Sequence, residues 1–244
     1  MEGRHVRGKS HGLQTKEEMA NVVTHAVGIV FSIFALGLMC SRALASGDQV
    51  RLVSCVVYGF SMLFLYSAST FHHLASYFVL TGAHKVNPEL KQSLHILDHS
   101  AVYILIAGTY TPFVLVKMRH EWPLVSTAMF VAIWCMAIAG VIFKYFLVGK
   151  HVRLSLALYI AMGWMGAFAM KILRSVMHHR AVMCLLVGGF AYTFGVIFYA
   201  VKRIPFGHAI WHSMCMLGTL AHFWGVLHYV IPLTTPVVLT TGGL

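Results

Sequence analysis

The chain has 244 residues, of which 59% are hydrophobic and only 10% are charged, and its formal net charge is +11. With a mean hydropathy of +0.77, this balance excludes an ordinary soluble globular domain. The lysines and arginines lie between apolar runs, so the positive charge indicates orientation in a membrane and not nucleic-acid binding.

Seven apolar runs follow one another, each about long enough to cross the hydrocarbon core of a bilayer. None shows the strict alternation of a transmembrane β-barrel. We therefore predict an all-α membrane protein with a seven-transmembrane helix bundle. The longest connection between spans is expected at 75–94, between the second and the third. The predicted spans are 22–40, 52–71, 101–116, 122–143, 154–170, 181–199 and about 207–229.

The chain divides into one membrane domain and two short ends. We expect a short cytoplasmic tail at 1–19, the transmembrane domain at 20–232 and a short C-terminal tail at 233–244. Lysine and arginine are more numerous in the segments that share a side with the N-terminus. This bias predicts a cytoplasmic N-terminus and, with seven spans, a C-terminus on the opposite side.

Ionisable side chains mark the ends of three predicted spans, where a bilayer would normally exclude them. The second span ends at Ser69 and His73, Asp98 precedes the third, and His208 and His212 open the seventh. Since the second span runs inward and the third and seventh run outward, all three groups are predicted to lie on the inner face.

These residue types favour a zinc site. On a helix, His208 and His212 lie one turn apart on the same side, so both can reach one ion, and His73 would add a third nitrogen. Three protein ligands leave zinc a fourth position for water, and Asp98 would act as the general base beside it. The five cysteines are never spaced as Cys-x-x-Cys and suggest neither a thiolate site nor a disulfide framework.

Other interpretations stay open for these residues. Asp98 would instead pair with Lys91, the membrane histidines would hydrogen-bond between helices, and His72 rivals His73 as a ligand. Ser69, four residues before His73, would either orient that histidine or bond the backbone.

Glu18, Asn21 and His25 form one stripe on the first span. They are candidates for residues that hold the metal ligands in place, and the alternative is a structural network or a helix-terminus role. His95, His99, His222 and His228 are weaker candidates for ligands.

Four motifs carry a resemblance to a known family. They are Glu18-x-x-Asn21-x-x-x-His25, Ser69-x-x-x-His73, Leu-Asp-His-Ser at 97–100 followed by Ile-Ala-Gly-Thr-Tyr-Thr-Pro-Phe at 106–113, and His-Ala-Ile-Trp-His at 208–212. Together they span residue 18 to about 229. In this combination the chain resembles the hemolysin III group of the progestin and adiponectin receptor (PAQR) family.

The resemblance implies seven transmembrane helices with a cytoplasmic N-terminus. In adiponectin receptors a zinc ion near the cytoplasmic face is held by three histidines, which match His73, His208 and His212. The family's aspartate that contacts the zinc-bound water matches Asp98. In that branch the site is associated with hydrolysis of lipid amides such as ceramide.

Three functions follow as expectations. The first is a zinc-dependent hydrolase of lipid amide or ester bonds, or a factor in membrane lipid homeostasis, whose lipid-like substrate enters from the bilayer. The second is a seven-helix signalling receptor with structural zinc, and the third is a pore-forming cytolytic protein. We expect a multi-pass protein, in the plasma membrane in preference to an internal membrane.

Overall fold

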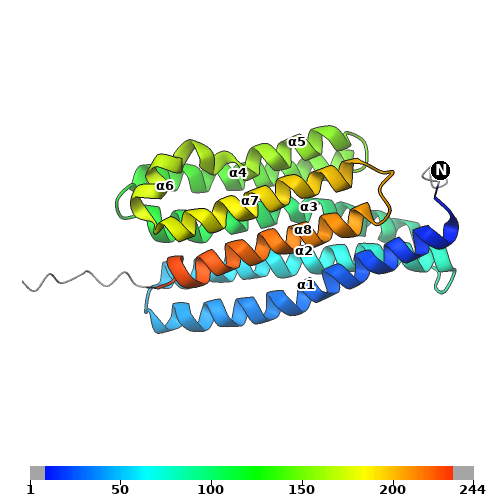
Figure 1. Cartoon of the computed structure of the whole chain (residues 1–244), viewed down its shortest axis with the longest axis horizontal. Helices are drawn as coiled ribbons and strands as arrows, with labels where there is room; N and C mark the ends of the chain where they lie inside the picture. Colours follow the sequence, from blue (N-terminus) through cyan, green and yellow to red (C-terminus); the bar gives the residue numbers. More distant parts are fainter. Residues whose placement is uncertain (1–8, 233–244) are drawn as a thin grey trace, which may run out of the picture.

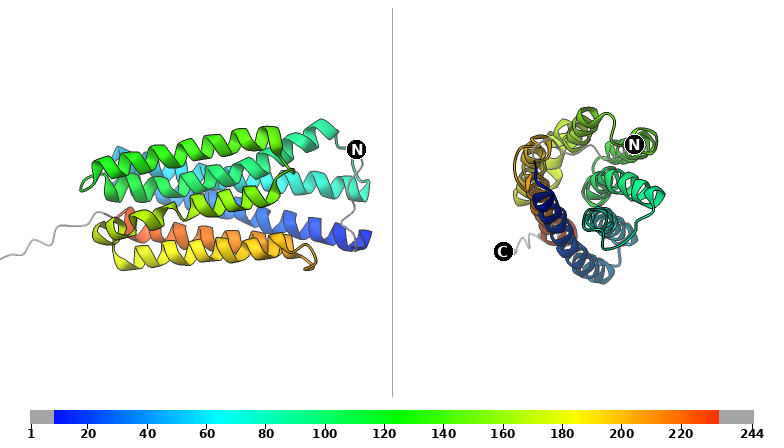
Figure 2. Two further views of the ribbon diagram at one scale, coloured as in Figure 1. Left: turned by 90° about the horizontal axis from the view of Figure 1, so that it is seen from above. Right: turned by 90° about the vertical axis from the view of Figure 1, so that its right-hand side faces the viewer.

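The computed structural model describes residues 9–232, and this part of the chain is helical throughout, with no strand. The helices run side by side along one axis (Figure 1), and seen end-on they surround that axis (Figure 2). The elements are α1 (His11–Ala45), α2 (Gln49–Thr81), α3 (Pro88–Pro112), η1 (Phe113–Met118), α4 (Pro123–Leu147), α5 (Val152–Gly163), η2 (Met165–Ala169), α6 (Met170–Val176), α7 (His179–Ala200), α8 (Gly207–Gly225) and η3 (Val226–Val230).

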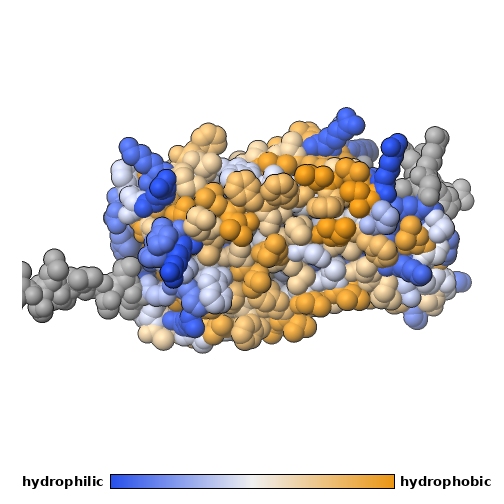
Figure 3. Space-filling view, viewed as in Figure 1, coloured by the Kyte–Doolittle hydropathy of each residue, from blue (hydrophilic) through white to orange (hydrophobic). Residues whose placement is uncertain are grey.

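Six of the described helical segments are long and apolar enough to cross a membrane. They are α1, α2, α3 with η1, α4, the segment from α5 through α6, and α7. Hydrophobic side chains cover the middle of the molecule and hydrophilic ones gather at its two ends (Figure 3), as expected of a surface that faces lipid. The prediction of an all-α, multi-pass membrane protein is confirmed.

The predicted seventh span forms α8 and η3, which are not among those six segments. This last helical segment packs against α7 and α1 and lies alongside them, antiparallel to α7 and in the same direction as α1 (Figure 1). The predicted C-terminal tail, 233–244, and residues 1–8 of the predicted N-terminal tail lie outside the described residues.

The bounds expected for the longest connection, 75–94, are wrong. Helix α2 continues to Thr81 and α3 begins at Pro88, so only a short loop separates them. Hydropathy marks the part of a helix that lies in hydrocarbon, whereas the helix itself continues into the polar interface. Gly82 ends α2 in a left-handed conformation (φ +68°), and the Asn87 side chain accepts a hydrogen bond from the Glu89 N–H to begin α3.

The fifth predicted span is one continuous run in sequence but is broken in the structure. Helix α5 ends at Gly163, and a 3₁₀ turn leads into α6. The Tyr110 hydroxyl donates to the Gly163 carbonyl at 2.7 Å and accepts from the Gly166 N–H at 2.7 Å. One side chain of α3 therefore satisfies two backbone groups at the break.

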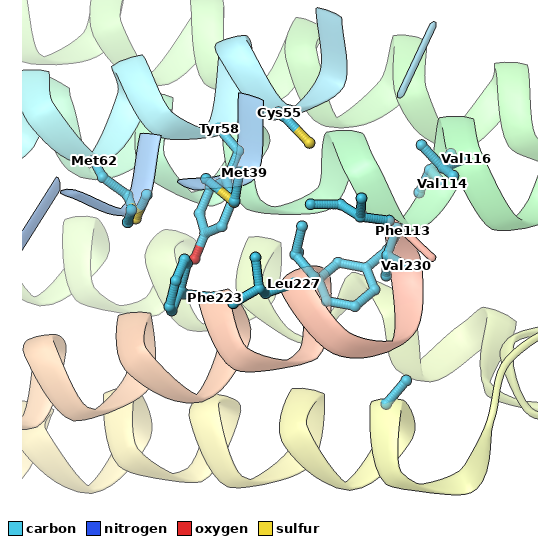
Figure 4. Packing of buried hydrophobic residues seen from close by; sticks show 14 of the residues in the cluster. Met39, Cys55, Tyr58, Met62, Phe113, Val114, Val116, Phe223, Leu227 and Val230 are labelled. Atoms are coloured by element: carbon cyan, nitrogen blue, oxygen red, sulfur yellow. The ribbon is translucent and has the colours of Figure 1, made fainter. Parts of the chain in front are cut away.

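The main hydrophobic core lies away from the end at which α1 begins, which we call the N-terminal end. It joins α1, α2, η1, α8 and η3 through fully or nearly fully buried side chains (Figure 4), among them Met39, Tyr58, Met62, Phe113 and Val230. With that half of the bundle filled by apolar groups, buried histidines concentrate at the N-terminal end.

Candidate metal centre

Three histidines meet at the N-terminal end of the bundle. His73 lies on α2, and His208 and His212 lie on the first turns of α8; one ligand atom from each lies within 4.8 Å of the others. The ring centroids are 4.8 Å (73–208), 5.0 Å (73–212) and 4.5 Å (208–212) apart, and the ring planes are inclined by 70°, 68° and 81°. A histidine coordinates through a lone pair in its ring plane, so three steeply inclined rings can direct their lone pairs toward one point. The group could hold a metal ion.

Helix α1 orients one ring of this group, His73. The Nδ1–H of His73 donates to Glu18 Oε2 at 2.7 Å, and Asn21 Nδ2 lies 3.4 Å from the same nitrogen. The opposite nitrogen, Nε2, is buried and has no hydrogen-bond partner within residues 9–232. A carboxylate on one imidazole nitrogen fixes the tautomer that leaves the other nitrogen bare for a metal.

His212 is held in the same way by a residue that sequence reasoning missed. Thr24 Oγ1 lies 3.1 Å from His212 Nδ1, and its own proton goes to the backbone carbonyls of Ala20 and Asn21 at 2.9 Å. The Thr24 oxygen therefore accepts from the His212 Nδ1–H, which leaves Nε2 bare. Thr24 follows Asn21 by three residues, a helical spacing that could have identified it.

The start of α8 is fixed by a strained residue and by a contact from α1. Phe206 has a left-handed backbone (φ +55°), and its N–H donates to Glu17 Oε1 at 2.7 Å. Lys9 pairs with the same carboxylate. Gly207 follows because a Cβ there would lie 2.8 Å from the Phe198 carbonyl oxygen. These contacts set the position from which His208 and His212 project.

Asp98 lies on α3 near this group. It is buried, with 9% of its surface exposed, and forms no ion pair with Lys91 or any other residue in the described part. His73, Ser69, Glu18 and Lys144 are the polar groups near its carboxyl group. Ser69 Oγ has no hydrogen bond of good geometry among residues 9–232, so neither of its expected contacts, to His73 or to the backbone, is seen.

The remaining candidate histidines lie outside the three-histidine group. His72 stacks on His95 at 5.0 Å, and His95 lies 4.6 Å from His99. The His72 ring also lies 5.1 Å from that of His73, so these rings form a row that adjoins the three-histidine group. Lys144 of α4 also lies near this row of rings. It is buried, with 4% exposed, and donates to Ser155 Oγ at 2.7 Å.

A cavity of about 120 Å³ begins beside these residues and extends along the bundle. His25, Ser69, Asp98, His208 and His212 border its polar end. From there it passes between α3, α5, α7 and α8, and Thr109, Tyr110, Trp164 and His222 border it farther along. From Asp98 to Tyr110 along α3 is about 18 Å at the helical rise, which is long enough for a hydrocarbon chain.

Comparison with known proteins places these motifs in one family. Residues 13–223 match the family model described as Haemolysin-III related. The chain is 41% identical over 219 residues to Hemolysin-3 of Bacillus cereus, covering 89% of this chain and 93% of the relative. It is 40% identical over 216 residues to the Hemolysin-3 homolog of Bacillus subtilis (strain 168), covering 88% and 95%. It is 28% identical over 215 residues to human Monocyte to macrophage differentiation factor, covering 88% and 84%.

Proposed function

Because the chain belongs to the haemolysin-III-related family, which confirms the resemblance seen in its motifs, we propose a specific role for its histidine cluster. The cluster binds zinc at the cytoplasmic face of the membrane. The zinc centre then hydrolyses an amide or ester bond of a membrane lipid, or otherwise serves membrane lipid homeostasis.

The donor set supports zinc as the ion. Three imidazoles, with a carboxylate behind one of them, match the open three-ligand sites of zinc hydrolases. The observation that carries the proposal is the buried Nε2 of His73, which has no partner among the described residues while its Nδ1 is held by Glu18. A nitrogen buried without a partner is costly, and a metal ion would satisfy it.

The surrounding residues support hydrolysis in place of simple binding. Zinc, when bound, would act as a Lewis acid and make water nucleophilic near neutral pH. Asp98 borders the same cavity, where it would orient that water and accept its proton. The apolar length of the cavity would hold the chain of a lipid that enters from the bilayer.

We also propose that α8 and η3 form the seventh span. Their 19 and 5 residues extend about 35 Å at the helical rise, enough to cross the hydrocarbon core. The distribution of lysine and arginine then supports a cytoplasmic N-terminus, and we favour the plasma membrane over an internal membrane.

Metal analysis followed by a lipid screen tests the proposal. Purified wild type should contain one zinc per chain, and His208→Ala should contain almost none. The same samples are then incubated with ceramides and with lipid esters, with Asp98→Ala as the variant that keeps zinc but loses turnover. Wild type without stoichiometric zinc would refute the metal site, and a zinc-loaded protein that turns over none of these lipids would refute the hydrolase.

A structural zinc is the second candidate, because the proposed site joins α1, α2 and α8. In a receptor of this kind, removal of zinc would lower the thermal midpoint and there would be no turnover to lose. The name of the Bacillus cereus relative points to a third role, cell lysis, and release of dye from liposomes tests it directly.

A further inference from the structure

His25 is a buried histidine beside the metal centre whose nitrogens are not satisfied by the protein. It lies on α1 with 4% of its surface exposed, and neither Nδ1 nor Nε2 has a hydrogen-bond partner among residues 9–232. Its ring stacks on His212, with centroids 3.5 Å apart and planes inclined by 19°. This contact places His25 next to the proposed zinc ligands.

The stacking excludes His25 as a further ligand in this arrangement. An ion bound to His212 lies in the plane of that ring, about 2 Å from its nitrogen. The lone pair and the N–H of His25 lie in a nearly parallel plane that is displaced by the stacking distance. They therefore point alongside the ion and not at it.

The fold nevertheless holds the His25 ring firmly in place. Tyr66 packs edge-on against it at 5.1 Å, and the Tyr66 hydroxyl donates to Thr219 Oγ1 at 2.7 Å. Gly28, one turn after His25, makes this possible, because a Cβ there would lie 2.5 Å from Tyr66 Cδ1. A phenylalanine in place of His25 would keep this packing without the two polar atoms, so the packing alone does not explain a histidine.

The cavity supplies the missing partner. His25 borders its polar end together with Ser69 and Asp98, so the head of a ligand seated there lies within reach of His25. We propose that His25 contacts the substrate, with its neutral imidazole donating an N–H to an oxygen of the lipid's polar head while that head lies at the zinc ion. This inference rests on the proposed function.

Two zinc-binding amphiphiles that differ in hydrogen bonding test it. Dodecanohydroxamic acid offers oxygens to His25, whereas dodecanethiol binds zinc through sulfur and offers none. Their affinities are measured by calorimetry on full-length, zinc-loaded wild type, His25→Phe and His25→Gln. We expect His25→Phe to weaken the hydroxamate about tenfold and to leave the thiol within twofold, because one hydrogen bond is lost. His25→Gln, which keeps an N–H, should stay within about threefold of wild type for both.

The outcomes separate this inference from the proposed function. If the wild-type protein binds no zinc, both the proposed metal site and the proposed role of His25 are refuted. Normal zinc content with unchanged hydroxamate affinity in His25→Phe overturns the role of His25 alone. Equal losses for both probes, or loss of zinc in His25→Phe, would show that His25 supports His212 instead. If His25→Phe does not fold, His25→Leu, which also lacks an N–H, takes its place, and an unchanged hydroxamate affinity in that variant overturns the inference.

Discussion

Replacing Glu18 by glutamine tests whether α1 prepares His73 to bind a metal. Glu18 Oε2 accepts the His73 Nδ1–H at 2.7 Å, and His73 is only 4% exposed, which makes this a charge-assisted contact at a buried ring. Loss of such a partner behind a metal ligand costs about 10- to 100-fold in metal affinity, or about 1.4 to 2.7 kcal/mol. The Glu18 side chain is 25% exposed, so solvent screens part of the effect, and we expect the lower end, about tenfold.

Zinc affinity is measured by competition with a chromophoric chelator on protein in detergent. Glu89→Gln removes the same charge from an exposed position in the first turn of α3 and serves as the control, with affinity expected within twofold of wild type. If Glu18→Gln binds zinc as tightly as Glu89→Gln does, then the contact from α1 does not raise the zinc affinity of the site, and the role assigned to Glu18 is wrong.

Three further changes probe other contacts. Thr24→Val removes the acceptor of the His212 Nδ1–H and should weaken zinc binding about fivefold in the same competition assay, since one neutral hydrogen bond is lost. Gly188→Ala would place a Cβ 2.2 Å from His222 Nε2 and should destabilise the fold by about 1 to 3 kcal/mol, seen as a lower thermal midpoint. Asp48→Asn should lower the thermal midpoint at pH 7. The difference in midpoint between this variant and wild type should disappear as the pH falls below about 4.

The pH dependence follows from the surroundings of Asp48 in the loop between α1 and α2. Partial burial alone would raise the pKa of Asp48, but the Arg51 N–H and the Arg119 guanidinium, 2.5 Å away, outweigh it and lower that pKa. A lowered folded-state pKa stabilises the protein above the unfolded value and loses this effect as acid protonates the carboxylate. A gap that stays constant down to pH 3 would contradict this account.

The other two predictions have matched controls. Thr15→Val removes a threonine of α1 whose hydroxyl only bonds its own helix, and zinc affinity should not change. Gly163→Ala adds a Cβ with no atom within 4 Å, so its thermal midpoint should stay near that of wild type. If zinc affinity falls equally in Thr15→Val and Thr24→Val, the loss is a general effect of altering α1. If the thermal midpoint falls equally in Gly163→Ala and Gly188→Ala, the fall does not come from the contact with His222.

The clustering of His73, His208 and His212 could be predicted from the sequence because the direction of each span assigns each end to one face of the bilayer. Contacts within the site were harder to predict. Thr24 looks like any small polar residue of a membrane helix, and its contact with His212 depends on how α1 is rotated against α8. The break after Gly163 leaves no mark in hydropathy, because both halves are apolar and the stabilising hydroxyl of Tyr110 comes from another helix.

The contact of Glu17 with Phe206 joins residues that are 189 positions apart. A ribosome makes the chain from its N-terminus, so α1 and α2 enter the membrane long before α8 exists. During that interval His73 lacks the neighbouring ring of His208, and His25 lacks the His212 ring on which it stacks. The three-histidine site can therefore be assembled only after α8 has been made and has packed against α1, so a chain that stops before residue 207 cannot form it.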